Sequence, residues 1–392
     1  MHKIIISLTS YPARIHLVYK VIKSLMNQQE KADEIILWLS ILEFPNQTDD
    51  LPENLRCMIG ENGFHIEWVK ENIKSHKKYF YALQNRKNII ITVDDDMYYS
   101  ETLVSTLMSS YRKHPNAISA RNVHIITKES EQLSPYLEWE GYTTEYIDIE
   151  RMDLCAIGVN GILYPPGCST KRWFDINLII KYAENQDDLW LKFNQVIDNI
   201  PVVYTGITES DQVLEGSQDH PLYIQNADCG DNDKAIKKMS EELKKEYTTI
   251  YHRWFQDLMR MDEMISVKRQ YFSQLLESIL IQHKKHNIYI CGAGKYANIL
   301  YKFIESCDKG ESIKAFLVTQ KIQKKNVDSG IQIKLIQDLN EQEFFCVLCG
   351  VGWTYRQELI NALKPYKFHE WIDIDLQNIE TLLLLESKVS HR

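Results

Sequence analysis

The sequence has no long hydrophobic run. No segment approaches the roughly 20 consecutive apolar residues that cross a bilayer, and the longest aliphatic run is the four leucines 382–385. The apolar stretch near the N-terminus is too short for the core of a secretory signal. We therefore expect no transmembrane segment and a cytoplasmic location.

Cysteine is also sparse: eight are scattered over 392 residues, which does not suggest a disulfide framework and favours a reducing compartment. Cys346 and Cys349 form a C-x-x-C within the apolar run FFCVLCGVG. Three residues apart on a strand, they point to opposite faces, so the pair fits neither a metal site nor a redox centre. We interpret both as buried small hydrophobic residues.

The chain lacks a surplus of positive charge. Its 45 Lys and Arg residues stand against 54 Asp and Glu residues, for a net charge of −9. A protein that coats nucleic acid needs the opposite balance, so we expect no nucleic-acid partner. Hydrophobic residues make up 44% and charged residues 25% of the chain, which excludes global disorder. The length predicts two or three domains.

What is present in the first 240 residues is an alternation of strands and helices. Apolar runs predict strands over residues 3–8, 34–40, 65–69 and 88–93. Helical spacing predicts helices over residues 15–26 and 77–85. Continuous apolar strands separated by helices indicate a parallel sheet covered on both faces. The fold class is therefore α/β, with a layout typical of nucleotide-binding proteins.

A change of pattern divides the rest of the chain. Residues 231–286 contain no Gly or Pro and read as amphipathic helices that join two domains, rather than as a membrane or coiled-coil segment. A second strand–helix–strand unit follows, with strands expected over residues 313–318, 344–352 and 369–375. We predict a first domain over 1–240, a helical linker over 241–285 and a Rossmann-like domain over 286–392.

The most informative motif is IIITVDDDMYYS, in which a buried strand ends in three carboxylates. Along an extended chain, Asp94 and Asp96 point to one side and Asp95 to the other. Carboxylates at the C-terminal edge of a parallel sheet suit Mg²⁺ or Mn²⁺ and a bound diphosphate. The alternative is a solvated turn that caps a helix beginning near Ser100 and Glu101. The triplet by itself leaves both open.

A second acidic pair, Asp187 and Asp188, precedes an apolar helical segment. Anchored in this way, one of these carboxylates is a candidate general base. The alternative is a pair that stabilises the positive end of the helix dipole. Downstream, His220 is a candidate third metal ligand, although a lone histidine is more often structural.

Four motifs together resemble a known family. Along the chain the motifs are, in order, SLTSYPARI, VDDD, YPPG and DDLW. With these motifs, residues 1–240 look like a GT-A-fold glycosyltransferase of the bacterial, family-two type. The VDDD would correspond to the DXD motif of that family. The resemblance implies that Asp94 and Asp96 hold Mn²⁺ or Mg²⁺ and that Asp188, or its neighbour Asp187, is the catalytic base.

The resemblance also implies contacts to a nucleotide-sugar donor, expected to be a UDP-sugar. The residues that it places along the donor are Thr9, Ser10, Tyr11, Arg14, Lys78, Tyr79, Asp94 and Asp95. The expected reaction transfers the sugar to a hydroxyl of a glycan, a lipid-linked sugar or a glycoprotein, with inversion favoured over retention. Such enzymes act in surface-glycan synthesis or protein glycosylation. The sequence leaves the sugar, the acceptor and the oligomeric state open.

The C-terminal part offers a rival site. Gly292, Gly294 and Ala297 match G-x-G-x-x-[GA] between a strand and a helix, as in dinucleotide-binding folds. The acidic residue expected about 20 positions later is missing, because the next strand runs into Thr319 and Gln320. We therefore favour a structural accessory domain. A nucleotide- or NAD-dependent enzyme centred here, and a non-catalytic binding protein, are the alternatives.

Overall fold

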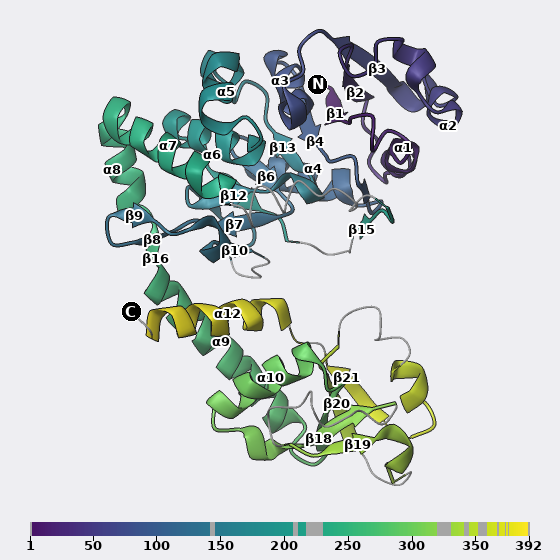
Figure 1. Cartoon of the computed structure of the whole chain (residues 1–392), viewed down its shortest axis with the longest axis vertical. Helices are drawn as coiled ribbons and strands as arrows, with labels where there is room; N and C mark the ends of the chain where they lie inside the picture. Colours follow the sequence, from purple (N-terminus) through teal and green to yellow (C-terminus); the bar gives the residue numbers. More distant parts are fainter. Residues whose placement is uncertain are drawn as a thin grey trace. The chain divides into compact units, whose positions relative to one another are not determined.

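The computed structural model describes residues 2–141, 146–206, 211–216, 230–319, 331–340, 345–351, 359–366, 368–372, 374 and 376–390. The chain forms two compact units, Met1–Met259 and Arg260–Arg392 (Figure 1). In the part of the chain that is described, no helix has the length and apolar character needed to span a membrane.

The first unit is built on a mixed, parallel-rich sheet, which confirms the α/β class. Its strand order is β11-β14-β6-β13-β4-β1-β2-β3. Neighbouring strands among β4, β1, β2 and β3 are parallel, whereas β13 runs antiparallel between β4 and β6. The strands are β1 (Ile4–Thr9), β2 (Glu34–Ser40), β3 (Phe64–Val69), β4 (Ile89–Thr92), β6 (Ile118–Ala120), β11 (Glu150–Arg151), β13 (Ile162–Tyr164) and β14 (Val202–Tyr204).

Both faces of this sheet are covered, as the apolar runs predict. Adjacent residues of β1 enter different cores: Ile5 belongs to one hydrophobic cluster and Ile6 to the other. Figure 1 shows α5, α6 and α7 grouped together beside the sheet. The helices of this unit are α1 (Val18–Met26), α2 (Glu53–Arg56), α3 (Lys77–Phe80), α4 (Leu103–Lys113), α5 (Ile176–Ala183), α6 (Asp187–Asp198), α7 (Asp231–Glu246) and α8 (Thr248–Asp257).

Short strands complete the first unit. β15 pairs with β5, and β7 lies between β10 and β12. The helix expected over residues 77–85 is interrupted: α3 ends at Phe80 and a 3₁₀ turn follows over Ala82–Gln84, in a segment whose aromatic residues have modest helix propensity. The short strands are β5 (Met97–Tyr98), β7 (Val123–Ile125), β8 (Thr127–Glu129), β9 (Gln132–Leu133), β10 (Glu140–Gly141), β12 (Leu154–Ala156) and β15 (Gln212–Val213). Strand β16 (Met259–Arg260) spans the boundary between the two units.

The structure divides the chain at Met259, not at residues 240 and 285 as the sequence pattern suggests. The reason is burial: Leu243, Tyr251 and Trp254 of α7 and α8 belong to the core of the first unit. Helix α9 (Met261–Gln282) instead contributes Phe272 to the core of the second unit. The helices expected to form a separate linker are thus distributed between the two units.

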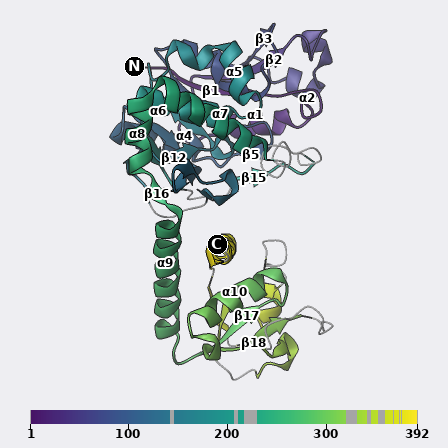
Figure 2. The same ribbon diagram turned by 60° about the vertical axis from the view of Figure 1, so that its left-hand side comes forward.

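The second unit has a parallel sheet of order β19-β18-β17-β20-β21. Figure 2 shows α9 as one uninterrupted helix that leads into it. Strand β18 has the expected bounds, and the strands expected over 344–352 and 369–375 appear as β20 and β21. The elements are β17 (Asn287–Cys291), α10 (Lys295–Ser306), β18 (Ile313–Val318), β19 (Ile333–Leu335), β20 (Phe345–Cys349), β21 (Phe368–Ile372) and α12 (Leu376–Ser390).

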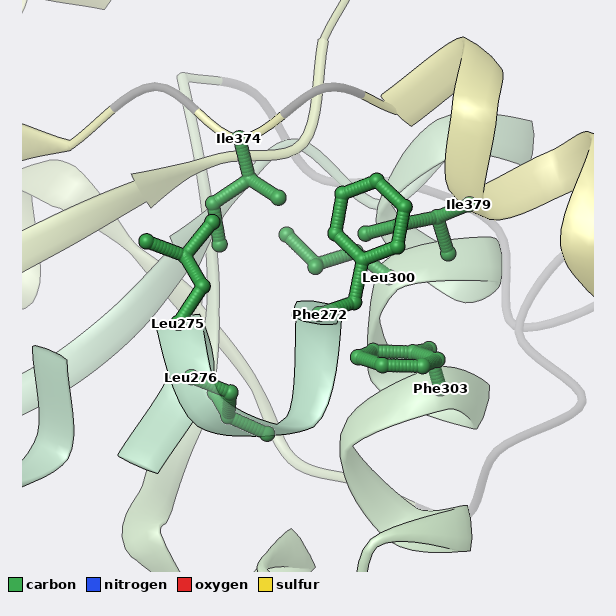
Figure 3. Close-up of a pocket in the computed structure, with 7 residues that line it drawn as sticks. All are labelled: Phe272, Leu275, Leu276, Leu300, Phe303, Ile374 and Ile379. Atoms are coloured by element: carbon green, nitrogen blue, oxygen red, sulfur yellow. The ribbon is translucent and has the colours of Figure 1, made fainter. Parts of the chain in front are cut away.

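A small pocket of the second unit is lined by apolar side chains (Figure 3). It offers no polar side chain for a phosphate or sugar, and its residues contribute to the core. The lining residues are Phe272, Leu275, Leu276, Leu300, Phe303, Ile374 and Ile379.

Candidate functional site

The candidate site begins where two neighbouring strands end. Because β1 and β4 are parallel, the residues that follow them meet at the same edge of the sheet. Ser10 donates a hydrogen bond from Oγ to Asp95 Oδ2 at 2.5 Å. Arg14 Nη1 lies 3.0 Å from both Asp95 Oδ1 and Asp96 Oδ2. Four residues predicted from the sequence are thereby brought together.

Lys78 of α3 connects the triplet to the second acidic pair. Its Nζ lies 2.8 Å from Asp94 Oδ1 and 2.8 Å from Asp187 Oδ2. Burial opposes the charge of this ammonium group, but the carboxylates of Asp187, Asp94 and Asp188 outweigh it and raise the pKa of Lys78 well above its usual value. Lys78 is therefore a fixed positive charge between the aspartate triplet and the first turn of α6.

Asp188 is placed differently from Asp187. Its Oδ2 accepts a hydrogen bond from the backbone N–H of Gly158 at 3.1 Å, and its buried Oδ1 has no hydrogen-bond partner among the described residues. Burial, together with the nearby Asp187 and Asp94 carboxylates, raises the pKa of Asp188 to about 7. A carboxylate with such a pKa can accept a proton near neutral pH.

Gly158 brings the backbone close to these groups. A Cβ atom at this position would lie 2.8 Å from Lys78 Nζ, 3.3 Å from Asp188 Oδ1 and 3.5 Å from Asp94 Oδ1. These distances also show that the three side chains converge on one point. The glycine belongs to the Gly-rich loop GVNG between β12 and β13, so its small size leaves room for the cluster.

The charge balance of the site suits a divalent cation. Among the described residues, five aspartates, 94–96, 187 and 188, lie beside the basic side chains of Arg14 and Lys78. Burial and the neighbouring Asp94 raise the pKa of Asp96 to about 6, although Arg14 opposes this. The basic side chains balance only part of the negative charge of these carboxylates. Carboxylate oxygens are the ligands that Mg²⁺ and Mn²⁺ prefer. The residues present therefore fit such an ion.

The helix-cap interpretation of the triplet does not describe this geometry. Helix α4 starts at Leu103, and its first turn contains no acidic residue. The aspartates instead pair with Arg14 and Lys78. The expected alternation also breaks down, because β4 ends at Thr92 and Arg14 reaches both Asp95 and Asp96.

Of the other predicted residues, Tyr11 lies beside the cluster, against Arg14, whereas the contacts of Thr9 and Tyr79 are with other residues. Thr9 Oγ1 donates to the Trp38 carbonyl at 2.8 Å, and the Tyr11 ring lies 5.7 Å from the Arg14 guanidinium carbon. Tyr79 is fully buried, and its hydroxyl is 2.8 Å from His76 Nδ1. His220 lies outside the described residues.

Sequence reasoning missed several residues that shape the site. Ser75 donates from Oγ to Asp187 Oδ1 at 2.9 Å. The fully buried pair Arg121 and Asp211 lies 2.9 Å apart, and Asp211 also accepts from the backbone N–H of Ser100, just beyond the triplet. These contacts join loops far apart in sequence, so no local pattern indicates them.

No protein-family model matches the sequence, and no curated protein matches it. Among solved structures, it is similar to glucosyl-3-phosphoglycerate synthase from Mycobacterium tuberculosis in complex with Mn²⁺, UDP and phosphoglyceric acid. There the TM-score is 0.31 at 11% identity, over 60% of this chain and 78% of that one.

A second structure of that synthase, in complex with Mn²⁺, UDP and glucosyl-3-phosphoglycerate, gives a TM-score of 0.32 at 12% identity, over 62% and 79% of the two chains. At these values the likeness does not establish an activity or a ligand for this chain.

The rival glycine motif has a structural explanation. Gly292 has φ +93°, and a Cβ there would lie 2.4 Å from Val351 Cγ1 and 3.1 Å from the Gly350 carbonyl oxygen. Ala297 is fully buried. Close packing of the loops after β17 and β20 thus accounts for this glycine without a ligand.

Proposed function

We propose that this chain is a metal-dependent glycosyltransferase that moves a sugar from a nucleotide-sugar to an acceptor hydroxyl. The observation that carries the proposal is the convergence of Asp94, Lys78 and Asp188 at the C-terminal edge of β1 and β4. Ligands of open α/β sheets bind at this edge. Its carboxylates fit a cation, and its basic side chains fit a diphosphate.

In this proposal Asp188 is the general base. Its Oδ1 has no hydrogen-bond partner among the described residues, and its pKa of about 7 suits proton transfer near neutrality. The acceptor oxygen bonds to the anomeric carbon, its proton passes to Asp188, and the bond to the nucleoside diphosphate breaks. Attack opposite the leaving group inverts the anomeric configuration.

Asp187 acts as a positioning residue. It is held by Ser75 and Lys78. Burial alone would raise its pKa, but the Lys78 ammonium group and the other polar neighbours lower it overall. Asp187 therefore stays ionised and orients Lys78. This distinguishes two carboxylates that the sequence left equivalent.

Asp94 and Asp96 would hold Mn²⁺ or Mg²⁺, and the ion would neutralise charge on the leaving diphosphate. Arg14 and Lys78 add positive charge at the same edge of the sheet. The UDP-linked donor, the glycan, lipid-linked or glycoprotein acceptor, inversion and a cytoplasmic location are the finer parts of the proposal.

The test starts with a screen of thermal stability against nucleotides and nucleotide-sugars, with and without Mn²⁺. Turnover of the donor that stabilises the protein is then followed as release of the nucleoside diphosphate. We expect Asp94→Asn/Asp96→Asn to lower metal-dependent turnover by about 100-fold or more while the fold is retained. The double variant Asp49→Asn/Glu61→Gln, at two exposed positions, is a control of equal charge change. Full turnover in a folded double variant would reject the metal assignment.

A further inference from the structure

We propose a second metal site, of the Zn²⁺ class, formed by His283, His286 and Cys346 within the second unit. One potential ligand atom from each residue lies within 4.8 Å of the others. His283 and Cys346 are buried. This site is separate in sequence from the aspartates of the proposed glycosyltransferase site, and it does not depend on that function.

The backbone holds the three residues in place. His283 follows the end of α9, and the backbone N–H of His286 donates to the His283 carbonyl at 2.8 Å. This turn leads directly into β17. Strand β20 runs beside β17, with Cys346 opposite Ile288. A helix end, a turn and a neighbouring strand thus supply the ligands.

The chemistry of the ligand set favours zinc. Two imidazoles and one thiolate are typical of Zn²⁺ sites, whereas Mg²⁺ and Ca²⁺ prefer oxygen. His283 Nδ1 lies 3.1 Å from Cys346 Sγ. Ligand atoms around tetrahedral zinc are separated by about 3.5 Å, so binding requires only small shifts.

Glu370 provides the carboxylate that often accepts a hydrogen bond from a metal-bound histidine. Its Oε2 lies 3.3 Å from His283 Nε2, and it is opposite Cys346 in the pairing of β20 with β21. A hydrogen bond from Nε2–H to this carboxylate leaves Nδ1 unprotonated and facing Cys346. This is the carboxylate–histidine–metal arrangement.

Metal binding would change the state of the Cys346 thiol, whose Sγ lies beside His283 Nδ1. When the metal binds, a Zn–S bond replaces the S–H bond and the proton is released to solvent.

The test uses the full chain in the Asp94→Asn/Asp96→Asn background, so that metal counts report on the second unit. After chelation, the protein is dialysed against Zn²⁺ or Co²⁺. Bound metal is counted by mass spectrometry, and Co²⁺–thiolate charge-transfer absorption is recorded. We expect one ion per chain, with a thiolate band.

Matched variants decide the outcome. Cys346→Ser and His286→Gln should lose the ion and the band, whereas Cys349→Ser, three residues along the same strand, should keep both. Glu370→Gln should weaken affinity about 10- to 100-fold. Zinc should raise the melting temperature only in the proteins that bind it. Unchanged metal counts in His286→Gln, or the absence of a thiolate band in the parent protein, would overturn the proposal, even if Cys346→Ser fails to fold.

Discussion

Neighbouring aspartates of α6 differ because of their partners. Asp187 is fixed by Ser75 and Lys78, which lower its pKa against the effect of burial. Asp188 receives one backbone hydrogen bond and has a pKa of about 7. At the residue scale, the environment alone therefore assigns different roles to chemically identical side chains.

Asp188→Asn should lower kcat by about 10²–10⁴-fold, because the amide cannot take the acceptor proton. The nucleotide-sugar should still bind with nearly unchanged Kd. Asp187→Asn should instead weaken donor binding, since Lys78 loses a partner. Steady-state kinetics and calorimetric titration of both variants distinguish the roles, and wild-type kcat in Asp188→Asn would contradict the base assignment.

Lys192, one turn after Asp188 on α6, is fully buried, and its Nζ has no hydrogen-bond partner among the described residues. Burial lowers the pKa of Lys192 from 10.5 to about 8, against the effect of Cys155 and Asp153. Below pH 8 the lysine is charged in both the folded and the unfolded states. The buried charge then lowers the free energy of unfolding by its full amount. Stability should rise between pH 8 and 10.5, as the folded state loses this proton first.

Lys192→Met should therefore raise the free energy of unfolding at pH 7 by on the order of 3 kcal/mol. The difference in the free energy of unfolding between Lys192→Met and the wild-type protein should become smaller as the pH approaches 10.5. Urea unfolding of both proteins across this range measures the difference. An advantage that does not depend on pH would contradict the assignment of the effect to Lys192 ionisation.

At the scale of elements, both strand ends and loops position the residues of the site. Strands β1 and β4 place two segments at one sheet edge, and the loop after β12 brings the Gly158 backbone against Lys78 and Asp188. The loop that carries Asp211 is tied to Arg121 by a buried ion pair. The shape of the site therefore depends on loop packing as much as on the sheet.

Gly158→Ala should disturb the cluster, because the added methyl group would lie 2.8 Å from Lys78 Nζ. Displacement of the ammonium group from Asp94 removes a charge-assisted hydrogen bond of about 1.5–3 kcal/mol, so donor affinity should fall roughly 10- to 100-fold. Gly294→Ala is the matched control, since no atom lies within 4 Å of its Cβ position. Equal affinities in the two variants would argue against this role of the loop.

At the scale of the whole molecule, the boundary between units is set by burial rather than by composition. Helix α7 is rich in charged residues. Even so, Leu243 of α7 and Tyr251 and Trp254 of α8 fill the core of the first unit. The charged residues cover the solvent side of amphipathic helices. The first unit therefore extends to Met259.

Residues 1–259 should fold alone and bind the same nucleotide-sugar as the full chain, whereas residues 1–240 should not fold. The shorter fragment lacks five buried hydrophobic residues, Leu243, Tyr251, Trp254, Phe255 and Leu258. Each contributes about 1.5–3 kcal/mol, against a typical total of roughly 5–15 kcal/mol. Circular dichroism and thermal unfolding compare the fragments, and equal stability would contradict the boundary.

The sequence by itself determined the α/β class and most strand positions, which follow from local periodicity. Only the family resemblance placed Ser10 and Arg14 in the same site as the aspartate triplet. Tertiary structure alone decided how Lys78 links Asp94 to Asp187, why Asp188 differs, and that Cys346 meets His283. Those contacts join segments between 16 and 109 positions apart, and their energies depend on burial, which no local pattern encodes.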